Sequence, residues 1–384
     1  MTHAESVYLD ANATTIAHPE VIESMVSCMN EHGNPSSLHR AGQSARRRVE
    51  LARGEVAALV GVRPSEIVFT SGGTESDNLA IAGTLDALPD RRRVLVAEVE
   101  HAAVRECIQR LARLGRCELV NLPVDDCGIV RPKVVEDAIA ADPDNTALVS
   151  VMWANNETGV VQPIADIGAV CRAHGVRFHT DAIQAIGRIP VDLSEVPVDL
   201  LTLSGHKFHG PKGIGALVVR PGLRLSPQNI GGPQERERRG GTENVPGVVG
   251  LGVAARLAQA WLASSALVEC AKWQPAFERT MRAAIPDVVV HSECAQRLWN
   301  TSCLGFPGRP AEGLLLQLSE AGVACSAGSA CASGSMEPMH SLLAVGMDEV
   351  MAGSSLRFSV GRDFPLDGEA TARKVLSVLA PAAV

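Results

Sequence analysis

The first two thirds of the chain alternate short apolar runs with longer stretches of helical periodicity. Six apolar runs have the length and composition of buried strands, at 66–70, 93–100, 118–122, 147–153, 176–180 and 198–203. Helical patterns lie between them at 79–88, 101–114, 133–141 and 164–173, and two more precede them at 19–31 and 42–60. Strands that alternate with helices in this way predict an α/β fold with a doubly wound, mostly parallel sheet.

The pattern changes beyond residue 245. Residues 245–285 are rich in Ala and Leu with helical periodicity, and the elements after them are shorter. Strands are predicted there at 300–306 and 354–362, and helices at 311–321, 341–344 and 367–383. Because 384 residues usually form more than one domain, we expect the 245–285 stretch to lead into a second domain.

Composition and charge exclude several classes of function. The net charge is −8 and no long basic run is present, so we expect no nucleic-acid partner. No apolar run reaches membrane-spanning length and the N-terminus has no signal pattern, so we expect a cytoplasmic protein that does not enter a membrane. The ten cysteines show neither a C-x-x-C pair nor zinc spacing, so we predict no metal site and reduced thiols.

A lysine follows the predicted strand at 198–203, in the sequence Ser204-Gly-His-Lys207. Burial disfavours an ammonium group, so a lysine at the end of a buried strand tends to become a neutral, nucleophilic amine. Such an amine can form a Schiff base with an aldehyde cofactor. The alternative is a strand end whose lysine reaches solvent.

The strand at 66–70 runs into a glycine-containing turn and a helix, residues 71–78. Gly73 lets the backbone approach a ligand and Thr74 adds a hydroxyl, and the free N–H groups of a helix N-terminus attract anions. The alternative is an ordinary capped helix start. His101, Asn155 and Asp181 also follow predicted strands, so they fall at the same carboxyl edge of the sheet, where ligands of such folds bind.

Three features lie outside this edge. The Gly-rich, charged stretch 231–244 is either a solvated loop or one that reaches across a subunit interface. Residues 322–335 are almost all small, so we expect a mobile loop on which Cys331 is an accessible thiol, while Cys325 follows apolar residues and is typical of packing. Arg357 lies in an apolar strand, where it indicates a buried anion such as a carboxylate.

Taken together, these residues give the chain a resemblance to the class I cysteine desulfurases, which are fold-type I pyridoxal-phosphate enzymes that feed sulfur into iron–sulfur cluster assembly. The resemblance covers nearly the whole chain, and residues 151–159 and 178–182 are most similar to the nitrogen-fixation branch. It rests on the motifs at 8–15, 33–37, 70–78, 100–101, 154–157, 181–184, 204–207, 240–244, 329–331 and 356–359.

The resemblance implies an aminotransferase-like architecture. A large cofactor-binding domain would span 16–258, and a small α+β domain of 1–15 and 259–384 would carry the mobile loop at about 322–335. Lys207 is implied to hold the cofactor aldehyde, Asp181 to pair with the ring nitrogen, and His101 to stack on the ring and handle protons. Gln184 would hydrogen-bond the ring hydroxyl, with Asn155 nearby. The implied phosphate ligands are Gly73, Thr74, Ser204, His206 and, from the other subunit of a homodimer, Thr242.

The resemblance also implies the reaction. Arg357 would bind the carboxylate of L-cysteine with help from Asn34, and Asn155 would also contact the substrate. Cys331 would take the sulfur atom as a persulfide, release alanine, and pass the sulfur to an iron–sulfur scaffold or another acceptor protein. Two alternatives stay open: another fold-type I enzyme, such as a selenocysteine lyase or an aminotransferase, and a non-enzymatic scaffold. A cysteine on a long loop argues against an aminotransferase, and a buried Lys207 argues against a scaffold.

Overall fold

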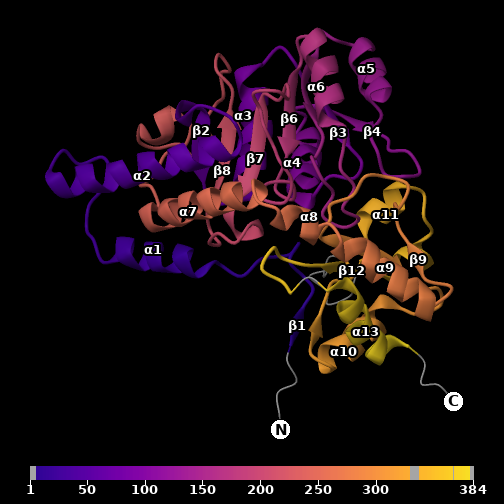
Figure 1. The fold of residues 1–384 in the computed structure, drawn as a ribbon. Coiled ribbons are helices and arrows are strands. Elements are labelled where there is room, and N and C mark those ends of the chain that lie inside the picture. The colour runs from indigo at the N-terminus through magenta and orange to yellow at the C-terminus, as the bar shows by residue number, and fades with distance from the viewer. Residues whose placement is uncertain (1–5, 329–336, 366, 381–384) are drawn as a thin grey trace.

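The computed structural model describes residues 6–328, 337–365 and 367–380. Its centre is a seven-stranded sheet with strand order β2-β8-β7-β6-β5-β3-β4 (Figure 1). Every neighbouring pair is parallel except those of β8, which is antiparallel to β2 and to β7. The α/β fold with a mostly parallel sheet is therefore confirmed, although the sequence pattern did not indicate β8. The strands are β2 (Ile67–Thr70), β3 (Arg93–Ala97), β4 (Glu118–Leu122), β5 (Thr146–Ser150), β6 (Arg177–Asp181), β7 (Leu200–Ser204) and β8 (Gly215–Val219).

Helices cover both faces of this sheet, as the doubly wound arrangement requires. One face carries α3 (Gly73–Ala87) and α4 (Ala102–Arg113). The other carries α1 (Pro19–Met29), α2 (Arg40–Leu59), α5 (Pro132–Ala140), α6 (Ile164–Ala173) and α7 (Val245–Leu262).

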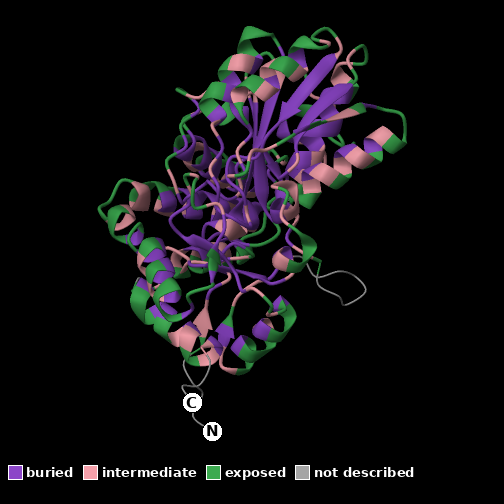
Figure 2. Ribbon diagram, turned by 90° about the vertical axis from the view of Figure 1, so that its right-hand side faces the viewer, coloured by how far each residue is buried: buried purple, intermediate pink, exposed green. Residues whose placement is uncertain are grey.

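Two cores result from these helix layers. Because side chains alternate along a strand, the neighbours Val94 and Leu95 are both fully buried yet belong to the two different cores. Figure 2 shows the central strands buried along most of their length and the helices exposed on their outer sides. Short 3₁₀ turns lie at η1 (Pro64–Glu66), η2 (Gly205–Lys207) and η3 (Gln234–Glu237).

A smaller part joins the start of the chain to its last third. Its three-stranded antiparallel sheet has the order β12-β10-β9, and β1 pairs in parallel with β11. Leu9, Trp273, Phe277 and Phe358 belong to a hydrophobic cluster of its own. The separate core supports the two predicted domains, whose boundaries stay a prediction. The elements are β1 (Val7–Tyr8), β9 (Val289–Val290), β10 (Thr301–Gly305), β11 (Val323–Ala324), β12 (Ser355–Ser359), α8 (Ala266–Cys270), α9 (Trp273–Ala284), α10 (Ala311–Glu320), α11 (His340–Ala344), α12 (Glu349–Ala352) and α13 (Gly368–Leu379).

Two helices differ from their prediction. Helix α3 begins at Gly73 rather than at residue 79, so the predicted anion loop is largely its first turn. The continuous helix expected at 245–285 is divided into α7, α8 and α9. The expectation that no apolar run reaches membrane-spanning length also needs a correction, because α7 has 18 residues and a mean hydropathy of 1.3. Its Leu251, Ala254 and Ala255 are fully buried in the core beside α1 and α2.

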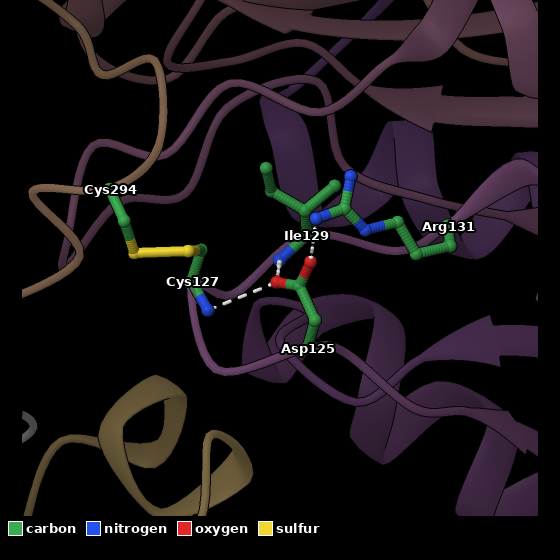
Figure 3. Close-up of a disulfide and its surroundings, with 5 residues drawn as sticks. All are labelled: Asp125, Cys127, Ile129, Arg131 and Cys294. Carbon is green, nitrogen blue, oxygen red and sulfur yellow. Dashed lines mark hydrogen bonds and ion pairs between the residues drawn. A yellow bond between two sulfur atoms is a disulfide. The ribbon is translucent and has the colours of Figure 1, made fainter.

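The prediction that all thiols are reduced is wrong for one pair. Cys127, in the turn after β4, and Cys294, in the turn after β9, form a disulfide with their Cα atoms 5.7 Å apart (Figure 3). The Asp125 carboxylate shapes this turn, since its Oδ1 accepts hydrogen bonds from the backbone N–H groups of Cys127 (3.0 Å) and Ile129 (2.9 Å). The two cysteines are 167 residues apart in the sequence, so no local spacing indicated their pairing.

Candidate active site

A cavity of about 350 Å³ opens at the carboxyl edge of the large sheet, where the smaller part of the molecule meets it. Most of the predicted site residues line it. Those from the sheet edge are Gly73, Thr74, His101, Asp181, Gln184, Ser204, His206 and Lys207, and Arg357 comes from β12.

The strand ends explain why these side chains meet. Asp181 is the last residue of β6 and Ser204 the last of β7, and the two strands pair in parallel. Gly73 follows β2 and His101 follows β3, where its Nδ1 caps α4 by accepting a hydrogen bond from Ala103 N. Parallel strands carry their carboxyl ends to one edge, so residues far apart in the sequence become neighbours.

Lys207 projects from η2 into this cavity. Its Nζ donates hydrogen bonds to the carbonyl oxygens of Asn12 (2.6 Å) and Ala13 (2.8 Å). Burial, together with the positive charges of Arg188 and Arg357, lowers the pKa of Lys207 to about 7. A substantial fraction of the amine is therefore neutral near pH 7, which is the form that attacks an aldehyde.

Asp77 and Asp181 form the floor of the cavity, and a third buried carboxyl group, Glu100, interacts by charge with Asp181. Asp181 Oδ1 accepts a hydrogen bond from Ile183 N at 2.9 Å, and burial raises the pKa of Asp181. Burial and the charge of Asp181 raise the pKa values of Asp77 and Glu100 well above the ordinary range. Both oxygens of Asp77 are buried without a hydrogen-bond partner among the described residues. A cationic ring nitrogen would give this set of acids an opposite charge, so the floor fits such a group.

A second group of lining residues fits a phosphate. The first N–H groups of α3, at Gly73 and Thr74, have no partner within the helix and carry the positive end of its dipole. A Cβ atom at Gly73 would overlap Cδ1 of Ile183, so a larger residue there would require the Ile183 side chain to move. Ser204 and His206 face the same region, and burial lowers the pKa of His206 to about 4. The imidazole is thus neutral near pH 7 and can donate a hydrogen bond without adding charge.

Arg357 forms the wall on the side of the smaller part. Its Nη2 donates to Asp10 Oδ1 at 2.6 Å and its Nη1 to the carbonyl oxygen of Asn156 at 2.9 Å. Its Nε is buried and has no partner among the described residues. The guanidinium is therefore fixed by two contacts, and its Nε–H is among the donors that remain for a further anion.

Three predicted residues do not line this cavity. The side chain of Asn155 is buried and committed to the fold, since its Nδ2 donates to Val99 O (3.1 Å) and Ser341 Oγ (2.8 Å). Asn34 and Thr242 are exposed in loops away from the cavity. Cys331 lies outside the described residues.

Several lining residues carried no role in the sequence analysis. Asp77 lies within the predicted anion loop, one helical turn after Gly73, and this spacing places it on the same face of α3 as Gly73. The sequence analysis did not use that spacing. Met152, Asn156, Glu157 and Ile183 are neighbours of the predicted Asn155, Asp181 and Gln184. The rest come from segments that no local pattern places at this edge: Asn12, Ala13, Ser326 and Gly328.

Comparison with known proteins places the chain among relatives of one kind. Residues 7–368 match the family model described as aminotransferase class-V. A cysteine desulfurase of Trichormus azollae is 46% identical over 357 residues, which are 93% of this chain and 88% of that protein. The crystal structure of a NifS-like protein from Rickettsia africae ESF-5 superposes with a TM-score of 0.88 and 31% identity, covering 97% of this chain and 99% of that one. The structure described as SspA in complex with cysteine has a TM-score of 0.80 and 34% identity, covering 93% and 99%.

Proposed function

The chain belongs to the class-V aminotransferase family, as one of its cysteine desulfurases, and we propose that it uses pyridoxal 5′-phosphate to convert L-cysteine to L-alanine. The observation that carries this proposal is the meeting of three features in one cavity. They are an amine with a lowered pKa at Lys207, the buried carboxyl group of Asp181, and the anion-binding first turn of α3 at Gly73. A solved relative in complex with cysteine supports the choice of substrate.

Each of these groups has a distinct task. When bound, pyridoxal phosphate supplies an aldehyde that captures amines and a ring that withdraws electrons from the substrate α-carbon. Lys207 would hold the cofactor through its amine, and the same amine would accept the α-proton of the substrate. Asp181 would pair with the ring nitrogen and keep it protonated. Gly73, Thr74, Ser204 and His206 hold the phosphate.

Arg357 orients the substrate by its carboxylate. The Nε donor and the planar guanidinium are suited to a carboxylate, and the contacts to Asp10 and Asn156 hold the group in place. His101 is exposed at the mouth of the cavity, where it would stack on the ring and exchange protons with the substrate.

Cys331 is the proposed sulfur acceptor. Its thiolate attacks the substrate sulfur, an S–S bond forms and the C–S bond breaks. In total, cysteine and the Cys331 thiol give alanine and a Cys331 persulfide, with no hydrogen lost or gained. An iron–sulfur scaffold or another acceptor protein then takes the outer sulfur by thiol exchange. The segment that carries Cys331 begins directly after Gly328, which lines the cavity.

The enzyme is proposed to act as a homodimer in the cytoplasm. Exposed apolar side chains gather on α1 and α2, including Ile22, Val26, Met29 and Leu51, and a second copy of the chain would cover them. Thr242, which lies away from the cavity of its own subunit, would reach the phosphate in the partner's cavity. A role in nitrogen fixation is supported only by residues 151–159 and 178–182, which resemble the nitrogen-fixation branch of the family.

Incubation of the purified protein with pyridoxal phosphate and L-cysteine tests the proposal. We expect alanine and sulfide, in the presence of a reducing thiol, in equal amounts. Release of pyruvate and ammonia, or transfer of the amino group to a keto acid, would indicate a different member of the fold class. Selenocysteine serves as a competing substrate in the same assay.

A further inference from the structure

An acidic side chain stands beside the proposed phosphate site. Glu75 follows Gly73 and Thr74 in the first turn of α3, and its Oε2 accepts a hydrogen bond from the backbone N–H of Ser71 at 2.7 Å. The carboxylate thus closes the turn between β2 and α3. A negative charge in this place would repel a bound phosphate unless another group cancelled it.

Arg239 is the group that cancels this charge. Its Nε donates to Glu75 Oε1 at 2.8 Å and its Nη2 lies 3.4 Å from Glu75 Oε2. Both side chains are largely buried, at 22% and 17% exposure, so solvent screens the pair only in part. Asn229 Nδ2 donates to Glu75 Oε1 at 3.0 Å as well. Although burial opposes it, the contacts with Arg239 and Ser71 hold the pKa of Glu75 below its ordinary value, so the carboxylate is charged.

The segment that carries Arg239 is itself anchored to the strand before the turn. Glu235 forms a buried two-point ion pair with Arg53 of α2, with both N–O distances at 2.8 Å. Glu235 Oε2 also accepts a hydrogen bond from Phe69 N, in β2, at 2.9 Å. Glu235 and Arg236 adopt left-handed backbone angles, with φ of 47° and 56°, which cost free energy in residues other than glycine. The ion pair offsets this strain and fixes the segment against β2.

We propose that Glu75 and Arg239 are a positioning pair for the cofactor phosphate. Glu75 fixes Ser71 N and so leaves the N–H groups of Gly73 and Thr74 directed at the phosphate, while Arg239 holds Glu75 and removes its repulsion. Neither residue touches the phosphate. The inference rests on the proposed function, because it assumes pyridoxal phosphate as the ligand.

A comparison of two ligands tests this role directly. Apoprotein is titrated with pyridoxal phosphate and with pyridoxal, which lacks the phosphate, and the absorbance of the lysine-bound cofactor is followed. In Arg239→Gln we expect the affinity for pyridoxal phosphate to fall on the order of tenfold, because an uncancelled charge faces the anion. The affinity for pyridoxal should change less than twofold. Glu75→Gln combined with Arg239→Gln should recover most of the lost affinity, because it removes the repelling charge.

Two further variants complete the design. Arg239→Lys keeps the positive charge and should retain most of the affinity even if Arg239→Gln unfolds. Arg373→Gln breaks an exposed ion pair with Glu369 on α13 and should change neither affinity. If Arg239→Gln lowered the affinity for both ligands equally, or changed neither affinity, the positioning role would be overturned. Failure of the unmodified protein to bind pyridoxal phosphate would instead overturn the proposed cofactor.

Discussion

The two walls of the active-site cavity are built in different ways. The wall from the large sheet consists of strand ends, so Asp181 is placed by the pairing of β6 with β7, and Ser204 by the pairing of β7 with β8. The wall from the smaller part depends on contacts between distant segments. Arg357 is held by Asp10, 347 residues earlier, and by Asn156 of the large part.

The difference corresponds to the two ligands. A resident cofactor needs a rigid, preformed site, and parallel strand ends provide one. A substrate that enters and leaves in each turnover is proposed to meet the wall that carries Arg357 and Ser326 and leads into the segment with Cys331. Changes in the sheet wall should therefore alter cofactor binding, and changes in the other wall should alter turnover of cysteine while the cofactor stays bound.

The largest effect is expected in the sheet wall, at Lys207. Lys207→Ala should lower desulfurase activity by about 10³-fold or more, because it removes both the cofactor anchor and the proton acceptor. The visible absorbance of the lysine-bound cofactor should vanish with it. Lys212→Ala, at an exposed lysine in the turn before β8, is the matched control and should keep both. Persistence of the absorbance in Lys207→Ala would assign the anchor to another residue.

Cys331→Ala should distinguish the functions of the two walls most clearly, because it should affect turnover of cysteine and not cofactor binding. We expect sulfide release to fall by at least about 10²-fold, since no thiol is left to attack the substrate sulfur, while the cofactor absorbance is unchanged. Cys325→Ala is the control, because burial raises the pKa of the Cys325 thiol to about 12 and keeps it unreactive. Full activity in Cys331→Ala together with loss in Cys325→Ala would exchange the two roles.

Arg357→Gln tests substrate binding in the smaller part. Loss of a charge-assisted hydrogen bond to the carboxylate should raise the KM for cysteine about 10- to 100-fold, with a smaller change in kcat. Pyridoxal phosphate affinity should be unaffected. Steady-state kinetics with cysteine measure this, with the exposed Arg113→Gln as control. A selective loss of affinity for pyridoxal phosphate would mean that Arg357 serves cofactor binding and not substrate binding.

The pH dependence of cofactor uptake tests the electrostatics of Lys207. Only the neutral amine attacks the aldehyde, and the pKa of Lys207 is about 7 instead of 10.5. The rate at which apoprotein captures pyridoxal phosphate should thus rise about tenfold between about pH 6 and pH 8 and then level off. Stopped-flow absorbance measures it. A rate that keeps rising up to pH 10 would mean that Lys207 is not buried as described.

The smallest effect on activity is expected at the disulfide that joins the two parts. Cys294→Ser should lower the free energy of unfolding by about 2–4 kcal/mol, with little change in cofactor binding. Thermal unfolding with and without dithiothreitol measures it. Dithiothreitol should destabilise the unmodified protein and should not change the stability of Cys294→Ser. Equal unfolding curves for the unmodified protein in both conditions would contradict a stabilising role.

The sheet wall is the part that the sequence predicted well. Apolar runs located the strands, and the rule that ligands bind at the carboxyl ends of parallel strands predicted that Gly73, Asp181 and Lys207 lie together. Asn155 shows the limit of that rule. It follows β5 as expected, but its amide is used to hold Val99 and Ser341 in place, and the pattern cannot distinguish these two uses of a polar side chain.

Contacts across the two parts could not be predicted in the same way. The Asp10–Arg357 ion pair and the Cys127–Cys294 disulfide join residues 347 and 167 positions apart. Neither contact can be predicted from local periodicity, because each depends on how the smaller part folds back onto the sheet. The continuous helical pattern at 245–285 likewise gave no sign of the breaks between α7, α8 and α9.

Identification of the cofactor-bearing residue tests the central claim most directly. Protein loaded with pyridoxal phosphate is reduced with borohydride, which makes the bond to the amine permanent, and its peptides are analysed by mass spectrometry. We predict one modified lysine, Lys207. Modification of Lys212 or of another lysine, with Lys207 unmodified, would contradict the assignment.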